Sequence, residues 1–309
     1  MQKNNKTHEK NYFLVNGKAR NKFRVYSTTT LFLFMIYLIK DIDIIQIVIK
    51  SSETVGLDLM NCIKYSDYWK LAIFFILPQI IGYIFICMLI KITFYVIKRD
   101  NYQKWKCQPT RWLSLKDEFL ELKMSVLNLV IGGILTSILF ILHQKFTIFK
   151  IYTNHEKYGD TWYLISTFLY FIYIDLFAFI VHRMLHIPFL YKTIHKHHHY
   201  FINITPFSAL ALHPIEYLMM VTVSFLFLFT VPIHIMAVTI NLSYIFIFNI
   251  LNHSGVKFYS YLLWEPNSIY HDDHHRYFHT NYGQSLVIWD KICKTLRRTN
   301  KVYGEDIFY

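Results

Sequence analysis

The chain has 309 residues, of which 54% are hydrophobic, 18% aromatic and only 17% charged, and its mean hydropathy is +0.28. This composition excludes an ordinary soluble domain and predicts a membrane protein. The net charge of +12 does not indicate a nucleic-acid partner, because the basic residues cluster in Lys3 to Arg24 and Lys91 to Lys116, beside apolar runs.

The N-terminal region contains a basic tail and a short apolar run. Residues 1–27 lack an apolar core with a small-residue cleavage site, so we expect no removable signal peptide. The apolar run at 28–39 meets charged residues before it resumes at 44–49, so it either spans with a polar kink or lies in the interface. Spanning is favoured, because the basic N-terminus and the basic segment at 98–116 both prefer the cytoplasm. This placement requires an even number of crossings between them.

Four longer apolar runs follow. Residues 71–97, 125–149 and 162–181 are each long enough for one crossing, which needs about 20 residues. The run at 217–251 is too long for one comfortable crossing and contains Pro232, which favours a tight helical hairpin. We therefore predict an all-α polytopic bundle of about four spanning helices plus a hairpin.

This topology has a consequence for the polar segments between the helices. Counting crossings places His182, His253 and His271 on the same cytoplasmic side. The predicted organisation is a tail (1–27), membrane helices with a cytoplasmic loop (28–160), a catalytic region (161–296) and a C-terminal tail (297–309). The four cysteines show no CxxC spacing, so we expect reduced thiols with no disulfide or thiolate zinc site: Cys62, Cys87, Cys107 and Cys293.

Histidines are concentrated in the second half of the chain. Thirteen of the sixteen lie between His182 and His279. Eight of them form three groups with metal-ligand spacing, namely His182/His186, His195/His198/His199 and His271/His274/His275. On a helix, residues three and four apart share a face, so each group is expected to point its imidazoles in one direction. The pattern predicts a metal site at one side of the membrane.

The simpler interpretation is that these histidines are structural, which is the usual outcome for a single pair four residues apart. Three groups in one apolar chain are different, because their many ring nitrogens all need partners and a shared metal centre supplies them. Eight nitrogen ligands exceed the four to six of one ion, which indicates two metals with open positions, as catalysis requires.

The ligand type does not select the metal, because imidazole suits zinc, copper, iron and nickel. The apolar surroundings favour aliphatic substrates, and attack on an unactivated C–H bond needs an oxidant such as two irons with dioxygen. The alternatives are a membrane zinc hydrolase, an inactive scaffold and a histidine-rich metal-handling protein. Metal transport would place histidines along the helices near the midplane, whereas here they follow helix ends.

Several further polar residues are candidates for supporting roles. Asp175 stands two turns before His182 on the same helical face, so it is expected to hydrogen-bond a ligand imidazole. Glu216, Asp272 and Asp273 are expected to do the same or to bind metal directly. The remaining histidines are expected to lie in solvent, in support of other residues or bonded to backbone carbonyls: His143, His197, His234 and His279.

The histidine groups are linked by short motifs that carry a family resemblance. The motifs are His182-Arg-Met-Leu-His186, His195-Lys-His-His198-His199, Thr205-Pro-Phe, His213-Pro-Ile-Glu216, Asn252-His-Ser-Gly255, His271-Asp-Asp-His274-His275 and Asn281-Tyr-Gly-Gln284. In order and spacing, residues 160–296 resemble the fatty acid hydroxylase superfamily, also called the sterol desaturase family. Acyl-CoA desaturases place their first group after the second helix and lack the linking motifs.

The resemblance implies an endoplasmic reticulum enzyme with a cytoplasmic non-haem di-iron centre. It implies dioxygen as co-substrate and electrons from NAD(P)H through an external reductase and cytochrome b5. The chain most resembles sterol ring-B desaturases, then sterol methyl oxidases, which implies a sterol substrate; fatty acyl or sphingolipid chains are the alternative. The eight histidines are then the catalytic metal ligands, and His213 and His253 are ninth and tenth ligands or supporting donors. Both a hydroxylated and a desaturated product are compatible with such a site.

Overall fold

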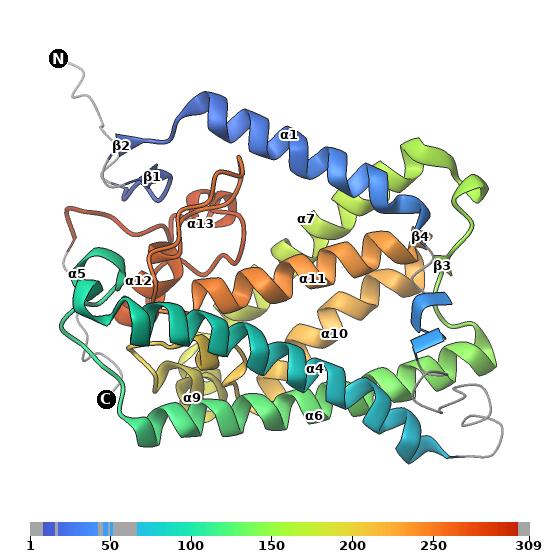
Figure 1. Cartoon of the computed structure of the whole chain (residues 1–309), viewed down its shortest axis with the longest axis horizontal. Helices are drawn as coiled ribbons and strands as arrows, with labels where there is room; N and C mark the ends of the chain where they lie inside the picture. Colours follow the sequence, from blue (N-terminus) through green and yellow to red (C-terminus); the bar gives the residue numbers. More distant parts are fainter. Residues whose placement is uncertain (1–8, 16–17, 43–45, 49, 52–66, 302–309) are drawn as a thin grey trace.

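The computed structural model describes residues 9–15, 18–42, 46–48, 50–51 and 67–301, and almost all of its regular structure is helical (Figure 1). The first half contains β1 (Leu14–Val15), β2 (Lys18–Ala19), α1 (Lys22–Leu38), η1 (Ile39–Asp41), α4 (Tyr68–Ile90), η2 (Lys91–Ile97), η3 (Arg99–Asn101), α5 (Tyr102–Trp105), α6 (Leu115–Phe146), β3 (Ile151–Tyr152) and η4 (His155–Lys157). The second half contains α7 (Gly159–Leu185), α8 (Pro188–Leu190), η5 (Tyr191–His195), α9 (Lys196–His199), η6 (Pro206–Leu210), α10 (Pro214–Thr230), β4 (Ile233–His234), α11 (Ile235–Asn252), α12 (Ile269–Tyr277) and α13 (Ile288–Ile292).

The predicted all-α membrane bundle is confirmed. Within the described residues, four helical segments are long and apolar enough to cross a membrane: α4 with η2 (Tyr68–Ile97), α6, α7 and α11. The shorter apolar helix α10 precedes α11, and the two form the predicted hairpin around Pro232. The helices run beyond the apolar cores from which they were predicted, because helical hydrogen bonding continues into the polar ends of each segment.

Whether the first apolar run crosses the membrane stays a prediction, because its helix α1, at 17 residues, is shorter than the four candidate spanning segments. Helix α1 ends at Leu38 and is not among the four spanning candidates in the described part of the chain. Much of the run predicted to resume at 44–49 lies outside the described residues. Helix α1 lies along the outside of α7 and α11 (Figure 1), and Ile36 and Ile39 pack against the core between those helices.

Helices α4 and α6 pack closely at a glycine. A Cβ atom on Gly133 of α6 would lie 2.3 Å from Cγ1 and 3.0 Å from Cα of Ile76 on α4. A larger residue at this position would therefore push the two backbones apart. Small residues permit this kind of close approach between membrane helices.

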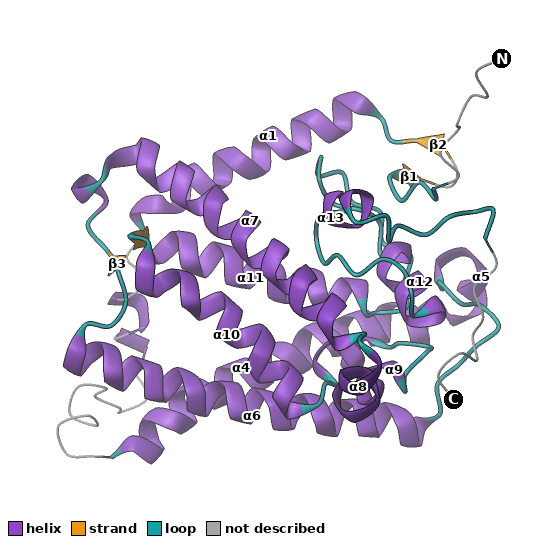
Figure 2. Ribbon diagram, turned by 180° about the vertical axis from the view of Figure 1, so that it is seen from behind, coloured by secondary structure: helices purple, strands orange, loops and turns teal. Residues whose placement is uncertain are grey.

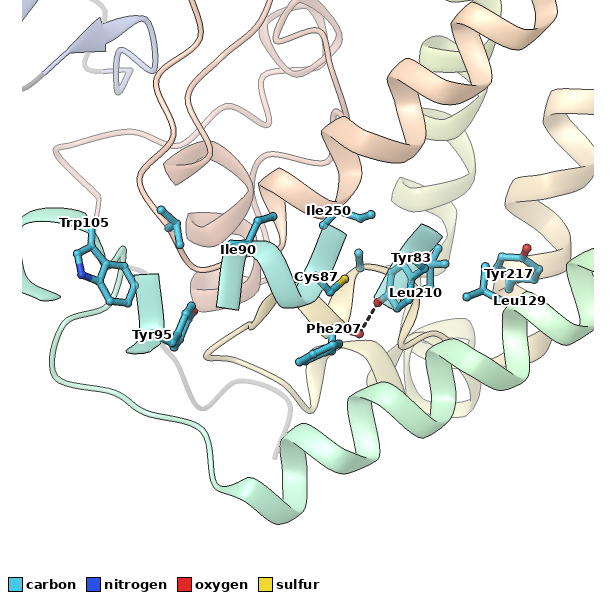
Figure 3. Close-up of a cluster of buried hydrophobic side chains, with 12 residues drawn as sticks. Tyr83, Cys87, Ile90, Tyr95, Trp105, Leu129, Phe207, Leu210, Tyr217 and Ile250 are labelled. Carbon is cyan, nitrogen blue, oxygen red and sulfur yellow. Dashed lines mark hydrogen bonds between the residues drawn. The ribbon is translucent and has the colours of Figure 1, made fainter. Parts of the chain in front are cut away.

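Helix α6 carries a polar face inside the bundle. Ser125 and Asn128 on this face donate hydrogen bonds to backbone carbonyls of Phe207 and Leu210, at 2.8 Å each. Tyr83 of α4 donates a bond of 2.7 Å to the same Phe207 carbonyl, which Figure 3 shows within the apolar cluster around η6. The segment between the second histidine group and α10 is thus fixed to α4 and α6.

The two ends of the bundle have different roles. Figures 1 and 2 show that the ends of α4, α7 and α11 and the starts of α6 and α10 lie at the end that carries α9 and α12. All three histidine groups are therefore at one end of the helices. At the opposite end, β3 pairs in parallel with β4, with Ile151 opposite Ile233 and Tyr152 opposite His234.

Two histidines outside the groups have local structural roles. His234 caps α11 by accepting a bond of 3.2 Å from the Met236 amide, and its Nε2 lies 2.9 Å from the carbonyl of Thr153. His143 accepts a bond of 3.2 Å from the Phe149 amide, so its partner is a backbone N–H where a carbonyl was expected. A neutral imidazole fills either role because it has one donor and one acceptor nitrogen.

Candidate metal centre

The predicted histidines form two compact groups that could each hold a metal ion. In the first, which we call group A, ligand atoms of five histidines lie within 4.8 Å of one another: His182, His186, His195, His199 and His274. In the second, group B, the same holds for four histidines: His198, His253, His271 and His275. The groups adjoin, since the ring centroids of His199 and His275 are 4.9 Å apart.

The division does not follow the sequence groups. Within α9, His199 belongs to group A and its neighbour His198 to group B, and within α12 His274 belongs to A and His275 to B. The expectation that each sequence group points all its rings in one direction holds for His182 and His186 and is wrong for the second and third groups. Successive residues on a helix differ by about 100° in direction, so each short helix lies between the two groups and supplies both.

The nitrogen distances suit metal coordination. Nε2 of His199 lies 3.0 Å from Nε2 of both His195 and His274, and in group B Nε2 of His253 lies 2.8 Å from that of His271. Two imidazole ligands about 2.1 Å from one ion at a right angle would have nitrogens about 3 Å apart. The described residues thus fit an ion in each group.

Most of these imidazoles are oriented through the ring nitrogen that faces away from the group. Nδ1 lies 2.8 Å from the Tyr282 carbonyl in His182, 2.7 Å from the Thr280 carbonyl in His274 and 2.9 Å from the Asn249 carbonyl in His253. A carbonyl only accepts, so Nδ1 carries the proton and Nε2 is free to bind metal.

Four of the nine histidines have no hydrogen-bond partner for Nδ1 among the described residues: His186, His199, His271 and His275. Both ring nitrogens of His186 and of His275 are buried with no hydrogen-bond partner among the described residues. Buried polar nitrogens of this kind are costly unless a partner is supplied. His186 is in group A and His275 in group B, so an ion in each group would satisfy one nitrogen of each.

The electrostatics favour neutral imidazoles. Burial, followed in effect by the neighbouring imidazoles, holds the pKa of His186 and of His275 well below the usual value. Burial lowers the pKa of His253 to about 4 and of His274 to about 3. These rings are neutral at physiological pH, which is the form that coordinates a metal.

Glu216 lies where a supporting role was predicted. Its Oε1 is 2.8 Å from Nδ1 of His195, and both side chains are almost completely buried. Pro214 and Glu216 open α10, and His213 caps the same helix by accepting a bond of 3.2 Å from the Ile215 amide. The His-Pro-Ile-Glu motif thus begins a helix and positions one carboxylate against group A.

Asp175 has different partners from those predicted. Its two oxygens accept hydrogen bonds of 2.7 Å each from the Ser285 amide and from Nε1 of Trp289. Seven residues of helix separate Asp175 and His182 by about 10 Å along the axis, which is too far for a hydrogen bond. Asp175 instead holds the segment whose Tyr282 carbonyl orients His182.

Asp272 and Asp273 also do not bond to imidazoles. Gln108 Nε2 lies 3.3 Å from Asp272, and Asp273 accepts bonds of 2.7 Å each from Lys10, Tyr12 and Arg297. Asp272 and Asp273 lie between His271 and His274 in the sequence, so on α12 they lie on the side opposite these histidines and face away from the groups. Asp273 ties the N-terminal segment to α12.

The remaining predicted histidines lie outside both groups. His213 caps α10, and its ring centroid is 5.2 Å from that of His197, which is exposed. His279 also belongs to neither group. Of the two predicted additional ligands, the structure therefore brings His253 into group B and leaves His213 outside both groups.

The loop after α12 contains functional residues that the sequence did not reveal. Asp290 accepts bonds of 3.0 Å and 2.7 Å from the amides of Tyr282 and Gly283, and it also bonds the hydroxyl of Tyr270. A Cβ on Gly283 would lie 2.5 Å from that hydroxyl. Asp290 therefore fixes the carbonyl that orients His182. Only the Asn-Tyr-Gly-Gln motif signalled this loop.

Comparison with known proteins supports the family resemblance that the sequence motifs predicted. Residues 167–295 match the family model described as fatty acid hydroxylase. The chain is 35% identical over 136 residues to a Delta(7)-sterol 5(6)-desaturase of Gibberella zeae, covering 43% of this chain and 42% of that protein. It is 34% identical over 152 residues to that of Leptosphaeria maculans, covering 49% and 42%.

A human protein is also similar. The chain is 29% identical over 194 residues to the lathosterol oxidase of Homo sapiens, covering 60% of this chain and 63% of that protein. The matches span about two fifths of the length of the two fungal relatives. No solved structure gives a significant match. These matches agree with the resemblance that the motifs carry: residues 167–295 fit the fatty acid hydroxylase family model, and the similar proteins are named as sterol desaturases and a lathosterol oxidase.

Proposed function

We propose that this protein is a membrane di-iron oxidoreductase that uses dioxygen to desaturate or hydroxylate an unactivated C–H position of a sterol. One observation carries the proposal: two adjoining groups of five and four histidines, all buried except the half-buried His186, lie at one end of an apolar helical bundle. The names of its relatives, sterol desaturases and a lathosterol oxidase, support a sterol substrate and favour desaturation.

The two groups would hold one iron ion each, with His182, His186, His195, His199 and His274 at one and His198, His253, His271 and His275 at the other. Bound iron would supply the activation of dioxygen that attack on an unactivated C–H bond requires. The protein's own contribution is to hold the imidazoles in one tautomer, through Glu216 and the backbone carbonyls. Burial of the ligands keeps bulk water from the reaction.

The overall reaction requires an external reductant. In desaturation, the substrate loses two hydrogens and dioxygen becomes two waters, with two electrons and two protons supplied from outside. In hydroxylation, one oxygen atom enters the substrate and one water forms. We propose that the electrons come from NAD(P)H through a reductase and cytochrome b5. The enzyme would lie in the endoplasmic reticulum membrane with its histidine end in the cytoplasm. The basic N-terminal segment would lie on the same side, because basic segments prefer the cytoplasm.

The test is lipid profiling by mass spectrometry of cells without the gene, with the gene, and with its His274→Ala or His197→Ala variant. We expect one sterol to accumulate unoxidised in the null and His274→Ala cells only. The product then distinguishes loss of two hydrogens from gain of one oxygen. Altered acyl chains with unchanged sterols would contradict the sterol substrate, and no lipid change at all would contradict an oxidase and favour metal handling.

The metal and the oxidant are tested on the purified protein. We expect two irons per chain by elemental analysis and complete loss of activity without dioxygen. A zinc-only preparation that remains active under anaerobic conditions would contradict the proposal and indicate a hydrolase. Removal of the metal with a chelator should abolish activity, and added ferrous iron should restore it.

A further inference from the structure

A large apolar chamber lies along the bundle, away from the histidine groups. It has a volume of about 720 Å³ and is enclosed by α1, α7, α11 and the loop at Trp264. Its apolar lining includes Leu33 and Ile36 of α1, Phe168 and Phe171 of α7, and Ile240 of α11. This volume lies within the range of pockets that bind small molecules, about 300 to 1,000 Å³.

Most of the polar side chains that line the chamber are bonded within the protein. Thr167 donates a bond of 2.6 Å to the Tyr163 carbonyl, and Thr29 accepts one of 3.0 Å from the Leu263 amide. The hydroxyl of Tyr244 accepts a bond of 3.2 Å from Trp264. The interior therefore suits a hydrocarbon group.

Helix α1 forms the outer wall and is fixed at both ends. At its start, Arg20 donates bonds of 2.8 Å and 2.9 Å to the carbonyls of Ser260 and Leu262. At its end, Lys40 forms an ion pair of 2.6 Å with Asp160, which precedes the chamber on α7. Because both ends are attached, the middle of α1 covers the chamber without filling it.

The chamber opens to the side, where a membrane lipid could enter. Its rim is formed by Leu33, Leu164 and Phe168, which are 50%, 44% and 63% exposed. Exposed apolar side chains on spanning helices, here Leu164 and Phe168 of α7, face the acyl chains of the bilayer. The opening is therefore directed into the membrane, where an apolar substrate would be dissolved.

The same two helices connect the chamber to the metal centre. Phe171 precedes His182 by eleven residues on α7, and Tyr244 precedes His253, which caps α11, by nine. At 1.5 Å per residue these separations are about 16 Å and about 14 Å. The two helices contact each other. A lipid that lies along these two helices with its reacting carbon at the histidine groups would therefore place its far end in the chamber.

A second cavity is less suited to a hydrocarbon group. It has a volume of about 540 Å³, lies between α7 and α13, and has Arg183 in its lining. A guanidinium ion beside an alkyl chain would lose hydration without gaining a partner. The uncharged chamber beneath α1 is therefore the better site.

The geometry points to the chamber as the binding site for the alkyl side chain of the sterol substrate, with α1 as its outer wall. This inference rests on the proposed function and adds where the substrate lies. It also gives a role to α1, which is outside the region matched by the family model. The length and bulk of the side chain are then selected by residues remote from the metal.

The first test uses a matched pair of substitutions on α11. Ile240 lines the chamber, whereas Ile247 is outside its lining and 45% exposed. We expect Ile240→Trp to raise KM for the full-length sterol at least about tenfold while a sterol with a truncated side chain is oxidised normally. Ile247→Trp should behave as wild type, and both variants should keep the wild-type metal content. Equal effects on the two sterols would overturn the inference.

The second test does not depend on turnover. A sterol with a diazirine at the end of its side chain is photolysed with the full-length protein in nanodiscs, and the labelled peptides are mapped. We expect labels in 164–171 and 240–244 that excess unmodified sterol removes. Labels elsewhere, or labels removed by phospholipid but not by sterol, would overturn the inference. A wild-type protein that labels as expected yet oxidises no sterol would contradict the proposed function alone.

Discussion

Glu216 Oε1 lies 2.8 Å from Nδ1 of His195, and this pair joins the start of α10 to group A. A carboxylate in this position fixes the ring orientation and raises the basicity of the ligand nitrogen on the other side of the ring. The two residues are 21 positions apart, so the pair exists only because η6 returns the chain to the second histidine group.

Removal of this carboxylate should weaken metal binding. We expect Glu216→Ala to lower metal affinity about 10- to 100-fold, because His195 loses its orienting acceptor. Glu216→Gln should keep much of the affinity, since its amide oxygen still accepts from Nδ1. Metal content measured against increasing chelator checks both variants. Equal metal retention by Glu216→Ala and wild type would show that the pair does not support the site.

The adjacent residues His197 and His198 provide a matched test of the metal centre. His198 is buried in group B, whereas His197 is exposed and outside both groups. We expect His198→Ala to abolish turnover and lower the metal bound per chain, because group B keeps only three imidazoles. His197→Ala should retain both properties. Elemental analysis and sterol turnover measure the difference, and similar results for the two variants would contradict the assignment.

Gly283 is expected to be intolerant of a side chain. Its Cβ would lie 2.6 Å from the Leu286 carbonyl, so the loop that presents the Tyr282 carbonyl to His182 would have to move. We expect Gly283→Ala to destabilise the protein by about 1–3 kcal/mol and to weaken metal binding. Gly82→Ala on α4 is the control, because nothing lies within 4 Å of its Cβ. Thermal unfolding in detergent compares the two, and an unchanged Gly283→Ala variant would refute the prediction.

Glu265 should make stability depend on pH. Burial raises the pKa of this carboxyl from 4.5 to about 7, although Tyr244 and Arg20 oppose the shift. The folded protein therefore binds the proton more tightly than the unfolded chain, so this contribution is complete below pH 4.5 and is lost as the pH rises through about 7. We expect Glu265→Gln to be more stable than wild type at pH 8, by roughly 3 kcal/mol.

The measurement for Glu265 is the free energy of unfolding in detergent at pH 5 and pH 8. The exposed Glu156→Gln serves as a control for the general effect of removing a negative charge. Wild type and Glu156→Gln should lose stability over this interval, and Glu265→Gln should lose less. A parallel pH dependence in all three proteins would mean that another group is responsible.

The membrane bundle could be predicted because its signals are local. Runs of about 20 apolar residues define spans, and the long run around Pro232 defined the α10–α11 hairpin. Helix α1 was harder to interpret, because its sequence is compatible with both a span and a surface helix. Its position was decided by anchors far away in the chain, such as the Ser260 carbonyl that Arg20 contacts.

The supporting residues of the metal centre were less predictable. Asp175 shares a helical face with His182, but the distance along the helix axis prevents contact. Asp175 instead accepts a hydrogen bond from the Ser285 amide. The acceptors for His182 and His274 are backbone carbonyls at Tyr282 and Thr280. Every residue has such a carbonyl, so no side-chain pattern identifies the one that will lie against a ligand.

The sequence by itself determined that this protein is an apolar helical bundle with histidines at metal-ligand spacing, because hydrophobic run length and i, i+3, i+4 spacing act within single helices. Only the tertiary structure decided that His198 and His199 serve different groups, that His253 completes group B while His213 caps a helix, and that α1 covers an apolar chamber. These relationships depend on how separate helices pack, and helix packing is set by contacts between residues that are distant in the chain.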